Sequence, residues 1–259
     1  MPDTHLLYNV DHHIARITIN REAQRNSVSP KAIGLFLDYL NQAEKDRDVR
    51  VICVTGAGDK AFCSGADLSQ VMGGNPEEAA TTFKQYADVL KRLSTFPKPT
   101  VARINGTCLA GGTGFMLACD IVIASNNARF GTPEVHVGLF PMMIGALIFR
   151  NVPRKKAMEM ILLGDKLTAG QALAMGMITR SVAPEDLDRE TDAILQALTA
   201  KSPIGMAMGK TAFHAASSMS LEQSLDYLAE KLMDVAATKD AVEGITAFIE
   251  KRVPVFTGE

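Results

Sequence analysis

The segment over residues 101–141 constrains the fold of this chain more than any other. Residues 101–104 are apolar except for Arg103, as in a buried strand, and the sequence Leu-Ala-Gly-Gly-Thr-Gly follows at residues 109–114. The apolar residues 115–118 then predict a helix that begins directly after these glycines. A helix start leaves backbone N–H groups without intrahelical acceptors, and anions bind at such groups. The sequence therefore predicts a strand, a tight turn and a helix that together hold an oxyanion.

A single carboxylate, Glu134, follows this turn. Residues 120–124 have the pattern of another strand, and Phe-Gly-Thr-Pro-Glu follows at residues 130–134. The carboxylate thus arrives directly behind a proline. A carboxylate beside an oxyanion site suggests proton transfer. From the residues alone, Glu134 is also compatible with a structural role, as the partner of a lysine or as a cap of the next element.

Strands and helices alternate along the first half of the chain. Residues 14–19 alternate apolar and mixed side chains, as in a half-buried strand, and residues 51–55 are apolar throughout, as in a strand buried on both faces. Between them, Ser29 and Pro30 predict the N-cap and first position of a helix. Another helix is predicted over residues 76–96. This order is typical of an α/β fold.

Two glycine-containing loops precede helical sequence in this succession. The first is Ala-Phe-Cys-Ser-Gly-Ala-Asp-Leu at residues 61–68, and the second is the glycine-rich turn at residues 109–114. We expect both to direct backbone N–H groups toward one pocket. Residues 73–76, Gly-Gly-Asn-Pro, predict a mobile surface loop of the kind that often borders an active site.

The second half of the chain is mostly helical. Proline, threonine and glycine residues mark the limits of three predicted helices, over residues 153–164, 168–176 and 184–198. From Ser202 onward the sequence is helical throughout, so Lys201 marks a boundary. We interpret residues 1–200 as a mixed α/β core and residues 201–259 as a helical C-terminal region. Such a region either packs against another subunit or folds back on its own core.

Composition argues against several classes of protein. The chain of 259 residues has 47% hydrophobic and 22% charged residues and a formal net charge of -2, so nucleic acid is not an expected partner. The longest apolar stretches fall short of the ~20 residues that span a bilayer, and the N-terminus lacks the pattern of a signal peptide. We therefore expect a cytoplasmic protein without a membrane partner. The four cysteines form no Cys-x-x-Cys pair, which predicts free thiols and no metal site: Cys53, Cys63, Cys108 and Cys119.

The motifs above, together with two further segments, carry a resemblance to a known family. Their order along the chain is residues 20–26, 61–67, 105–112, 130–134 and 244–252. One glycine turn alone is weak evidence, whereas five segments in the right order are strong evidence. The chain resembles the enoyl-CoA hydratase/isomerase, or crotonase, superfamily nearly from end to end.

The resemblance implies a fold, an assembly and a substrate. The fold is a crotonase-like spiral of strand–helix repeats with a helical C-terminal trimerisation region, assembled as a homotrimer or a dimer of trimers. Its substrate is an acyl-CoA, in which coenzyme A is part of the thioester, and no cofactor or metal is permanently bound. The resemblance also implies that the N–H groups of Ala66 and Gly111 donate to the thioester oxygen, while Glu134 moves a proton at the α-carbon.

Further residues of the matching segments are implied to contact the substrate. Those expected at the acyl group are Gly65, Asp67, Leu68, Gly112, Gly114, Pro133, Phe140 and Met142. Those expected at coenzyme A are Arg25, Asn26, Ala66 and Lys210. Simpler interpretations stay open for some of them, because Asp67 also fits a helix cap and isolated basic residues such as Arg25 and Lys210 are often only solvated.

The main departure from the family pattern is Gly114. Typical hydratases of this family carry a glutamate there, which works with a second glutamate at the position of Glu134. Members that are Δ3,Δ2-enoyl-CoA isomerases often keep only the second, so the pattern favours an isomerase-like reaction. Relatives that hydrolyse 3-hydroxyisobutyryl-CoA also have this glycine, but they carry an aspartate where this chain has Met142. A hydrolase and a non-catalytic acyl-CoA-binding protein are the alternatives.

Overall fold

We describe the fold from a computed structural model, in which residues 4–72 and 75–259 are placed well enough to be described. Of the loop predicted over residues 73–76, Gly73 and Gly74 lie outside the described residues. Asn75 is the N-cap of helix α3 (Pro76–Ser94), since its side chain accepts a hydrogen bond from the backbone N–H of Glu78. Within the described residues, no helix is both long and apolar enough to cross a lipid bilayer.

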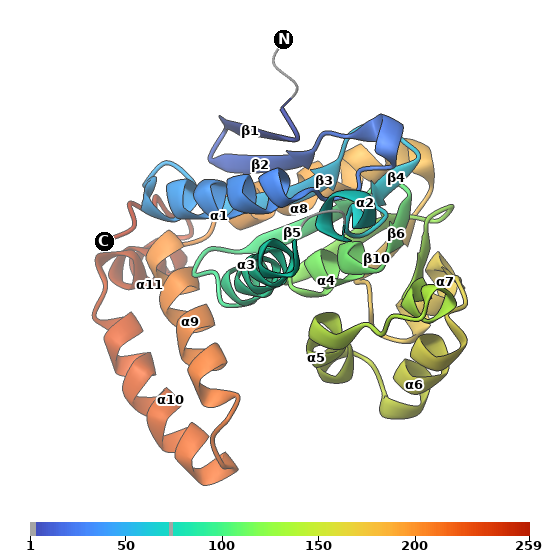
Figure 1. Cartoon of the computed structure of the whole chain (residues 1–259). Coiled ribbons are helices and arrows are strands. Elements are labelled where there is room, and N and C mark those ends of the chain that lie inside the picture. The colour runs from blue at the N-terminus through green and yellow to red at the C-terminus, as the bar shows by residue number, and fades with distance from the viewer. Residues whose placement is uncertain (1–3, 73–74) are drawn as a thin grey trace.

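The larger of two sheets forms the centre of the fold (Figure 1). Its six strands, in spatial order, are β1 (Leu6–Asp11), β2 (Ile14–Ile19), β3 (Val51–Gly56), β5 (Thr100–Ile104), β7 (Ile121–Ser125) and β10 (Arg180–Val182). Only the β1–β2 pair is antiparallel, and the other pairs are parallel. The predicted strands at 14–19, 51–55 and 101–104 are thus confirmed.

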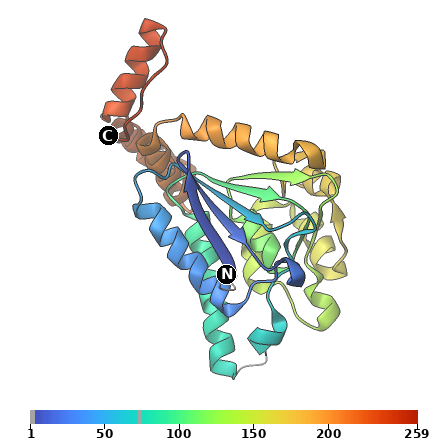
Figure 2. The same ribbon diagram turned by 90° about the horizontal axis from the view of Figure 1, so that it is seen from above.

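Helices cover both faces of this sheet, as Figure 2 shows. Successive side chains of a strand point to opposite faces. In β3, Ile52 and Val54 join the main core beneath α1 (Pro30–Lys45) and α3, while Val51 and Cys53 pack toward α8 (Leu187–Thr199). A strand buried on both faces needs apolar residues at every position, which explains the continuous apolar run.

A smaller sheet lies beyond the carboxyl ends of the central strands. Its order is β4 (Ala61–Cys63), β6 (Thr107–Leu109), β8 (Arg129–Gly131) and β9 (Leu167–Thr168). Strands β4, β6 and β8 are parallel, and each follows a strand of the larger sheet directly in sequence: β3, β5 and β7. The chain therefore repeats a unit of long strand, short strand and helix, which is the predicted spiral.

Two of the next helices match the predicted limits closely: α6 (Arg154–Leu163) and α7 (Ala169–Ala174). Helix α5 (Met142–Asn151), which precedes them, was not predicted. Gly164 ends α6 in the left-handed conformation, and Thr168 forms a capping box at α7. The helix predicted over residues 184–198 begins as a 3-10 turn, Pro184–Asp186, before it continues as α8.

Three C-terminal helices project from the body of the chain (Figure 1). They are α9 (Pro203–Ala216), α10 (Leu221–Ala236) and α11 (Lys239–Glu250). The buried carboxylate of Asp240 accepts hydrogen bonds from the Ser202 hydroxyl and from the backbone N–H groups of Thr257 and Gly258, which attaches the last residues to α9. Large apolar side chains on these helices are exposed in the single chain: Phe213, Leu225, Leu232, Met233, Ile245 and Phe248.

Candidate active site

Three neighbouring parallel strands end at the three groups that the sequence predicts to be catalytic. Strand β4 leads to Ala66, β6 to Gly111 and β8 to Glu134. Ligands of α/β proteins bind at the carboxyl ends of parallel strands, because those ends share one edge of the sheet. The β4–β6–β8 order therefore places these three residues at one edge.

The first loop holds Ala66 beside Val28. The Val28 N–H donates to the carbonyl of Gly65 at 2.8 Å, and the N–H of Asp67 donates to the carbonyl of Val28 at 2.9 Å. These two bonds leave the Ala66 N–H between them without an acceptor among the described residues. Ala66 is exposed, so a ligand can reach this N–H.

A nearly buried ion pair fixes this loop from behind. The Arg21 guanidinium donates to the Asp67 carboxylate at 2.9 Å and to the carbonyl of Ser27 at 2.8 Å. Hydrogen bonds from the Ser69 hydroxyl and from Arg21 lower the pKa of Asp67, although burial opposes this effect. Asp67 also accepts a bond from the backbone N–H of Gln70 at the start of α2 (Leu68–Met72). Its carboxylate thus supports the loop, as the cap interpretation expected.

The second loop turns sharply at Ala110. Its φ of 50° and ψ of -127° are unusual for a residue with a side chain. Its N–H donates to the carbonyl of Gly131 at 2.9 Å, and its carbonyl accepts from the Thr113 N–H at 2.9 Å. Helix α4 (Gly111–Leu117) begins here, so the Gly111 N–H has no intrahelical acceptor. Backbone strain of this kind is common at functional sites.

The two loops are in close contact at Gly65. This residue has a φ of +102°, which favours glycine. A Cβ atom there would lie 2.7 Å from the Cβ atom of Ala110 and 3.3 Å from the backbone nitrogen of Gly111. Any side chain at Gly65 would therefore force the loops apart. Gly112 is buried in the first turn of α4, behind this contact.

Glu134 lies on a short 3-10 helix, Pro133–Val137, directly after β8. Its side chain is half-buried, and its Oε2 atom is buried without a hydrogen-bond partner among the described residues. Burial removes water from the carboxylate and raises the pKa of Glu134 above its ordinary value, although its own backbone N–H opposes the shift. The alternative of a structural ion pair is not supported, since no lysine or arginine contacts this carboxylate in the described chain. A carboxylate of raised pKa suits proton transfer near neutral pH.

The space above Gly114 is filled by side chains from other helices. A Cβ atom at Gly114 would lie under 3.0 Å from the hydroxyl oxygen of Tyr86 and 2.5 Å from Cγ2 of Ile144. Tyr86 does not stand out in the sequence as a site residue, because it is one of several apolar positions in the helix predicted over residues 76–96. Its hydroxyl donates to the carbonyl of Gly111 at 2.6 Å. Burial raises the pKa of Tyr86 well above its ordinary value, so the phenol stays protonated.

Of two neighbouring residues predicted to contact coenzyme A, one has a buried side chain with other partners and one is exposed. The Asn26 side chain is fully buried, and its amide nitrogen donates to the carbonyls of Ala57 and Ala61. Its side chain therefore holds the loop from inside and does not face a ligand. Arg25 is exposed, and only its backbone carbonyl is bonded to the site loop, by accepting from the Ser64 N–H at 3.2 Å.

Lys210 lies apart from this edge within one chain. Its ammonium group donates to the carbonyl of Lys98 at 3.0 Å and pairs with the carboxylate of Asp120. Lys98 and Asp120 precede β5 and β7, so they mark the amino ends of the strands. Ala66, Gly111 and Glu134 follow carboxyl ends, and the chain itself does not bring Lys210 to them.

Residues expected at the acyl group differ in exposure. Leu68 is exposed, and Pro133 is half-buried beside Glu134. Phe140 and Met142 are 49% and 75% exposed, so the single chain leaves both open to solvent. Within the described chain, no group of three or more His, Cys, Asp or Glu side chains is arranged to hold a metal ion.

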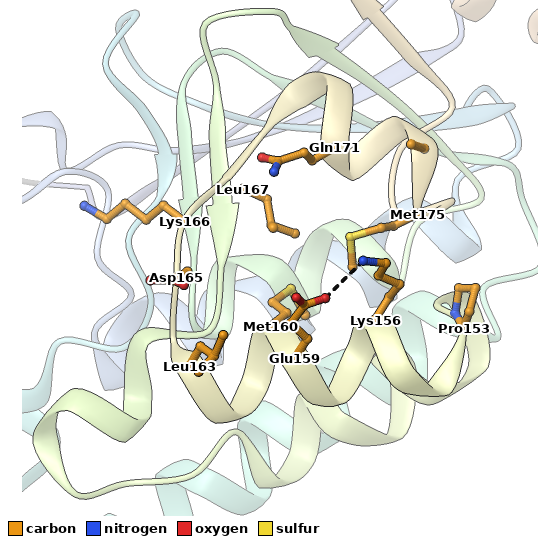
Figure 3. A pocket seen from close by; sticks show the side chains of 11 residues that line it. Pro153, Lys156, Glu159, Met160, Leu163, Asp165, Lys166, Leu167, Gln171 and Met175 are labelled. Carbon is orange, nitrogen blue, oxygen red and sulfur yellow. Dashed lines mark hydrogen bonds and ion pairs between the residues drawn. The ribbon is translucent and has the colours of Figure 1, made fainter.

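A separate hollow of about 550 Å³ lies between α6, β9 and α7 (Figure 3). Met160, Leu167 and Met175 contribute apolar surface, and Lys156 pairs with Glu159 at 3.1 Å along α6. None of the predicted site residues lines this hollow. It is therefore distinct from the edge that carries Glu134.

Comparison with known proteins shows the family of the chain. The sequence pattern of the family Enoyl-CoA hydratase/isomerase matches residues 9–259. The chain belongs to this family. It is thus an acyl-CoA enzyme of the enoyl-CoA hydratase/isomerase type, a family whose substrates are CoA thioesters.

Individual members of the family are similar to this chain over nearly its whole length. The chain is 35% identical to enoyl-CoA hydratase domain-containing protein 3, mitochondrial, of Xenopus laevis, over 95% of this chain and 84% of that protein. It is 31% identical to the short-chain-enoyl-CoA hydratase of Clostridium acetobutylicum, over 92% of each. The crystal structure of an enoyl-CoA hydratase from Bacillus anthracis superposes with a TM-score of 0.94 at 31% identity, over 98% of this chain and 100% of that one. The crotonase-like fold is thereby confirmed.

Proposed function

We propose that this enzyme moves a double bond in an enoyl-CoA by means of a single carboxylate. The carboxylate of Glu134 removes a proton from the α-carbon of a 3-enoyl-CoA, and the electron pair moves through the carbonyl onto the thioester oxygen. The N–H groups of Ala66 and Gly111 stabilise this dienolate. The protonated Glu134 then returns the proton to the γ-carbon, which produces a 2-enoyl-CoA with no loss or gain of atoms.

The packing above Gly114 is the observation that carries this proposal. Hydration requires that a water molecule be oriented and deprotonated at the β-carbon while the α-carbon is protonated, and hydratases of this family use two glutamates for it. Here Tyr86 and Ile144 occupy the space into which a side chain at Gly114 would extend. Proton return from one carbon to another requires only Glu134.

Steady-state assays with two substrates test this proposal. We expect conversion of 3-hexenoyl-CoA to 2-hexenoyl-CoA with a higher kcat/KM than hydration of crotonyl-CoA. Hydration that is as fast or faster would contradict the single-carboxylate mechanism. Release of free CoA thiol from 3-hydroxyisobutyryl-CoA would favour the hydrolase alternative. Tight binding of CoA without turnover of any thioester would favour a non-catalytic binding protein.

We also propose that the helical C-terminal region forms a trimer contact. Its exposed apolar side chains include Phe248, which is 85% exposed on α11. Large apolar side chains that are exposed together on a single chain are typical of protein interfaces. Light scattering is expected to give three or six times the mass of the chain, and replacing Phe248 with Ser is expected to shift the distribution toward smaller species. A stable monomer of the unaltered protein would contradict the proposed assembly.

A further inference from the structure

Tyr86 joins α3 to the turn that carries one proposed oxyanion donor. Its ring is 8% exposed and packs edge-on against Phe115, with ring centroids 5.2 Å apart. Phe115 in turn stacks on Phe36 at 5.1 Å. These aromatic contacts hold the ring independently of its hydroxyl group. The hydroxyl then donates to the carbonyl of Gly111 at 2.6 Å, a short distance for such a bond.

This hydrogen bond is made to Gly111, the residue whose own N–H is proposed to donate to the thioester oxygen. The carbonyl of a first-turn residue ordinarily accepts the N–H four residues later, so the phenol is an additional donor to the same oxygen. The residue before it, Ala110, is held at a φ of 50°. A strained conformation persists only where surrounding contacts restrain it. On one side the turn is held by the bond from the Ala110 N–H to Gly131, and on the other by Tyr86.

We propose that Tyr86 is a positioning residue of the oxyanion hole. Its hydroxyl holds the carbonyl of the peptide that follows Gly111. Through the Gly111 Cα atom this restrains the preceding peptide, so that the Gly111 N–H points at the thioester oxygen before the enolate forms. Oxyanion donors accelerate a reaction because their orientation is set in advance, so a donor that is free to rotate loses much of its effect. This inference rests on the proposed enolate mechanism and adds to it the residue that orients one of its two donors.

The test compares two tyrosine-to-phenylalanine variants. Tyr86→Phe removes the hydroxyl and keeps the aromatic packing. Tyr8→Phe is the matched control, because the Tyr8 hydroxyl is buried without a hydrogen-bond partner in the described chain and its ring stacks on Tyr39 at 5.0 Å. For each variant we would measure kcat and KM with 3-hexenoyl-CoA. Infrared difference spectra would record the carbonyl band of bound hexanoyl-CoA labelled with ¹³C at that carbon, since its shift reports how strongly the oxyanion hole polarises the thioester.

We expect Tyr86→Phe to lower kcat by about tenfold or more with KM changed less than about twofold, as for a lost interaction that acts in the transition state. The carbonyl band of bound hexanoyl-CoA should move back toward its position in free solution. Tyr8→Phe should leave kcat, KM and the carbonyl band unchanged. If Tyr86→Phe is less stable than the control, both measurements are made at a temperature where circular dichroism shows both variants folded, and the band then reports only the folded, ligand-bound protein.

Two results would overturn the inference. An unchanged band and kcat in Tyr86→Phe would show that the phenol only packs in the core. A lower kcat with an unchanged band would show that Tyr86 acts elsewhere than on the oxyanion hole. Failure of the underlying mechanism is recognised separately, because it would appear as normal turnover in Glu134→Gln.

Discussion

Glu134→Gln is expected to lower kcat/KM for 3-hexenoyl-CoA by about 10²–10⁴-fold, the usual contribution of a positioned general base. The amide cannot accept the α-proton, and the other carboxylate on the oxyanion loops, Asp67, is already paired with Arg21. The side chain keeps its size, so the KM for the substrate should change little. Steady-state kinetics of the two proteins check this result.

The pH dependence of the unaltered enzyme supplies an independent control. Glu134 acts as a base only when ionised, and burial raises its pKa above the ordinary 4.5. Activity should therefore fall as the pH is lowered through a midpoint above 4.5, and the residual activity of Glu134→Gln should lack this transition. A carboxylate whose pKa is raised by folding is less stable in the folded than in the unfolded chain once ionised. Glu134→Gln should consequently be more stable than the unaltered protein above that midpoint. Equal acid profiles in both proteins would contradict the assignment.

Gly114→Ala is expected to lower the free energy of unfolding by about 1–3 kcal/mol, the usual effect of overpacking a tight core. The added methyl group would overlap the hydroxyl of Tyr86 and Cγ2 of Ile144. The Tyr86 ring cannot easily move away from the added methyl group, because it is buried against Phe115. Chemical denaturation followed by circular dichroism measures the change.

Gly34→Ala is the matched control for this substitution. Gly34 lies inside α1, and a Cβ atom there would meet no heavy atom within 4 Å. Alanine at such a helix position usually adds about 0.5–1 kcal/mol of stability. In a Tyr86→Phe background the cost of Gly114→Ala should decrease, since the overlapping oxygen is gone. Equal stability of Gly114→Ala and Gly34→Ala would mean that the space above Gly114 is open and that a second acid could be accommodated there.

The position of Glu134 after a strand could be predicted because its signal is local. A strand, a proline and Glu134 follow one another within fifteen residues of sequence, and a carboxylate next to an apolar segment stands out by composition. The glycine loops were recognised for the same reason, since tight turns require particular residue types at adjacent positions. The helices also followed local signals, such as the N-caps Ser29, Ser202 and Ser220.

The short strands β4, β6 and β8 could not be predicted, although they align the site. Each has three residues, too few for an alternating pattern to be visible. Their pairing joins segments that are far apart along the chain, as where Cys63 lies opposite Cys108. The burial of the Asn26 amide could not be predicted either, and neither could the position of Lys210 at the amino ends of the strands. Both depend on hydrogen-bond partners that are distant in sequence.

The sequence by itself determined the family, the alternation of strands and helices, and the absence of a carboxylate at Gly114, because each can be recognised from short segments and their order along the chain. The tertiary structure decided what stands in the place of that carboxylate. Tyr86 comes from a helix that begins 38 residues earlier at Pro76, and in the sequence it is only one apolar position among several. Packing of α3 against α4 brings its hydroxyl to Gly111 and into the space above Gly114. Such a contact between distant segments exists only once both helices have packed on the same sheet.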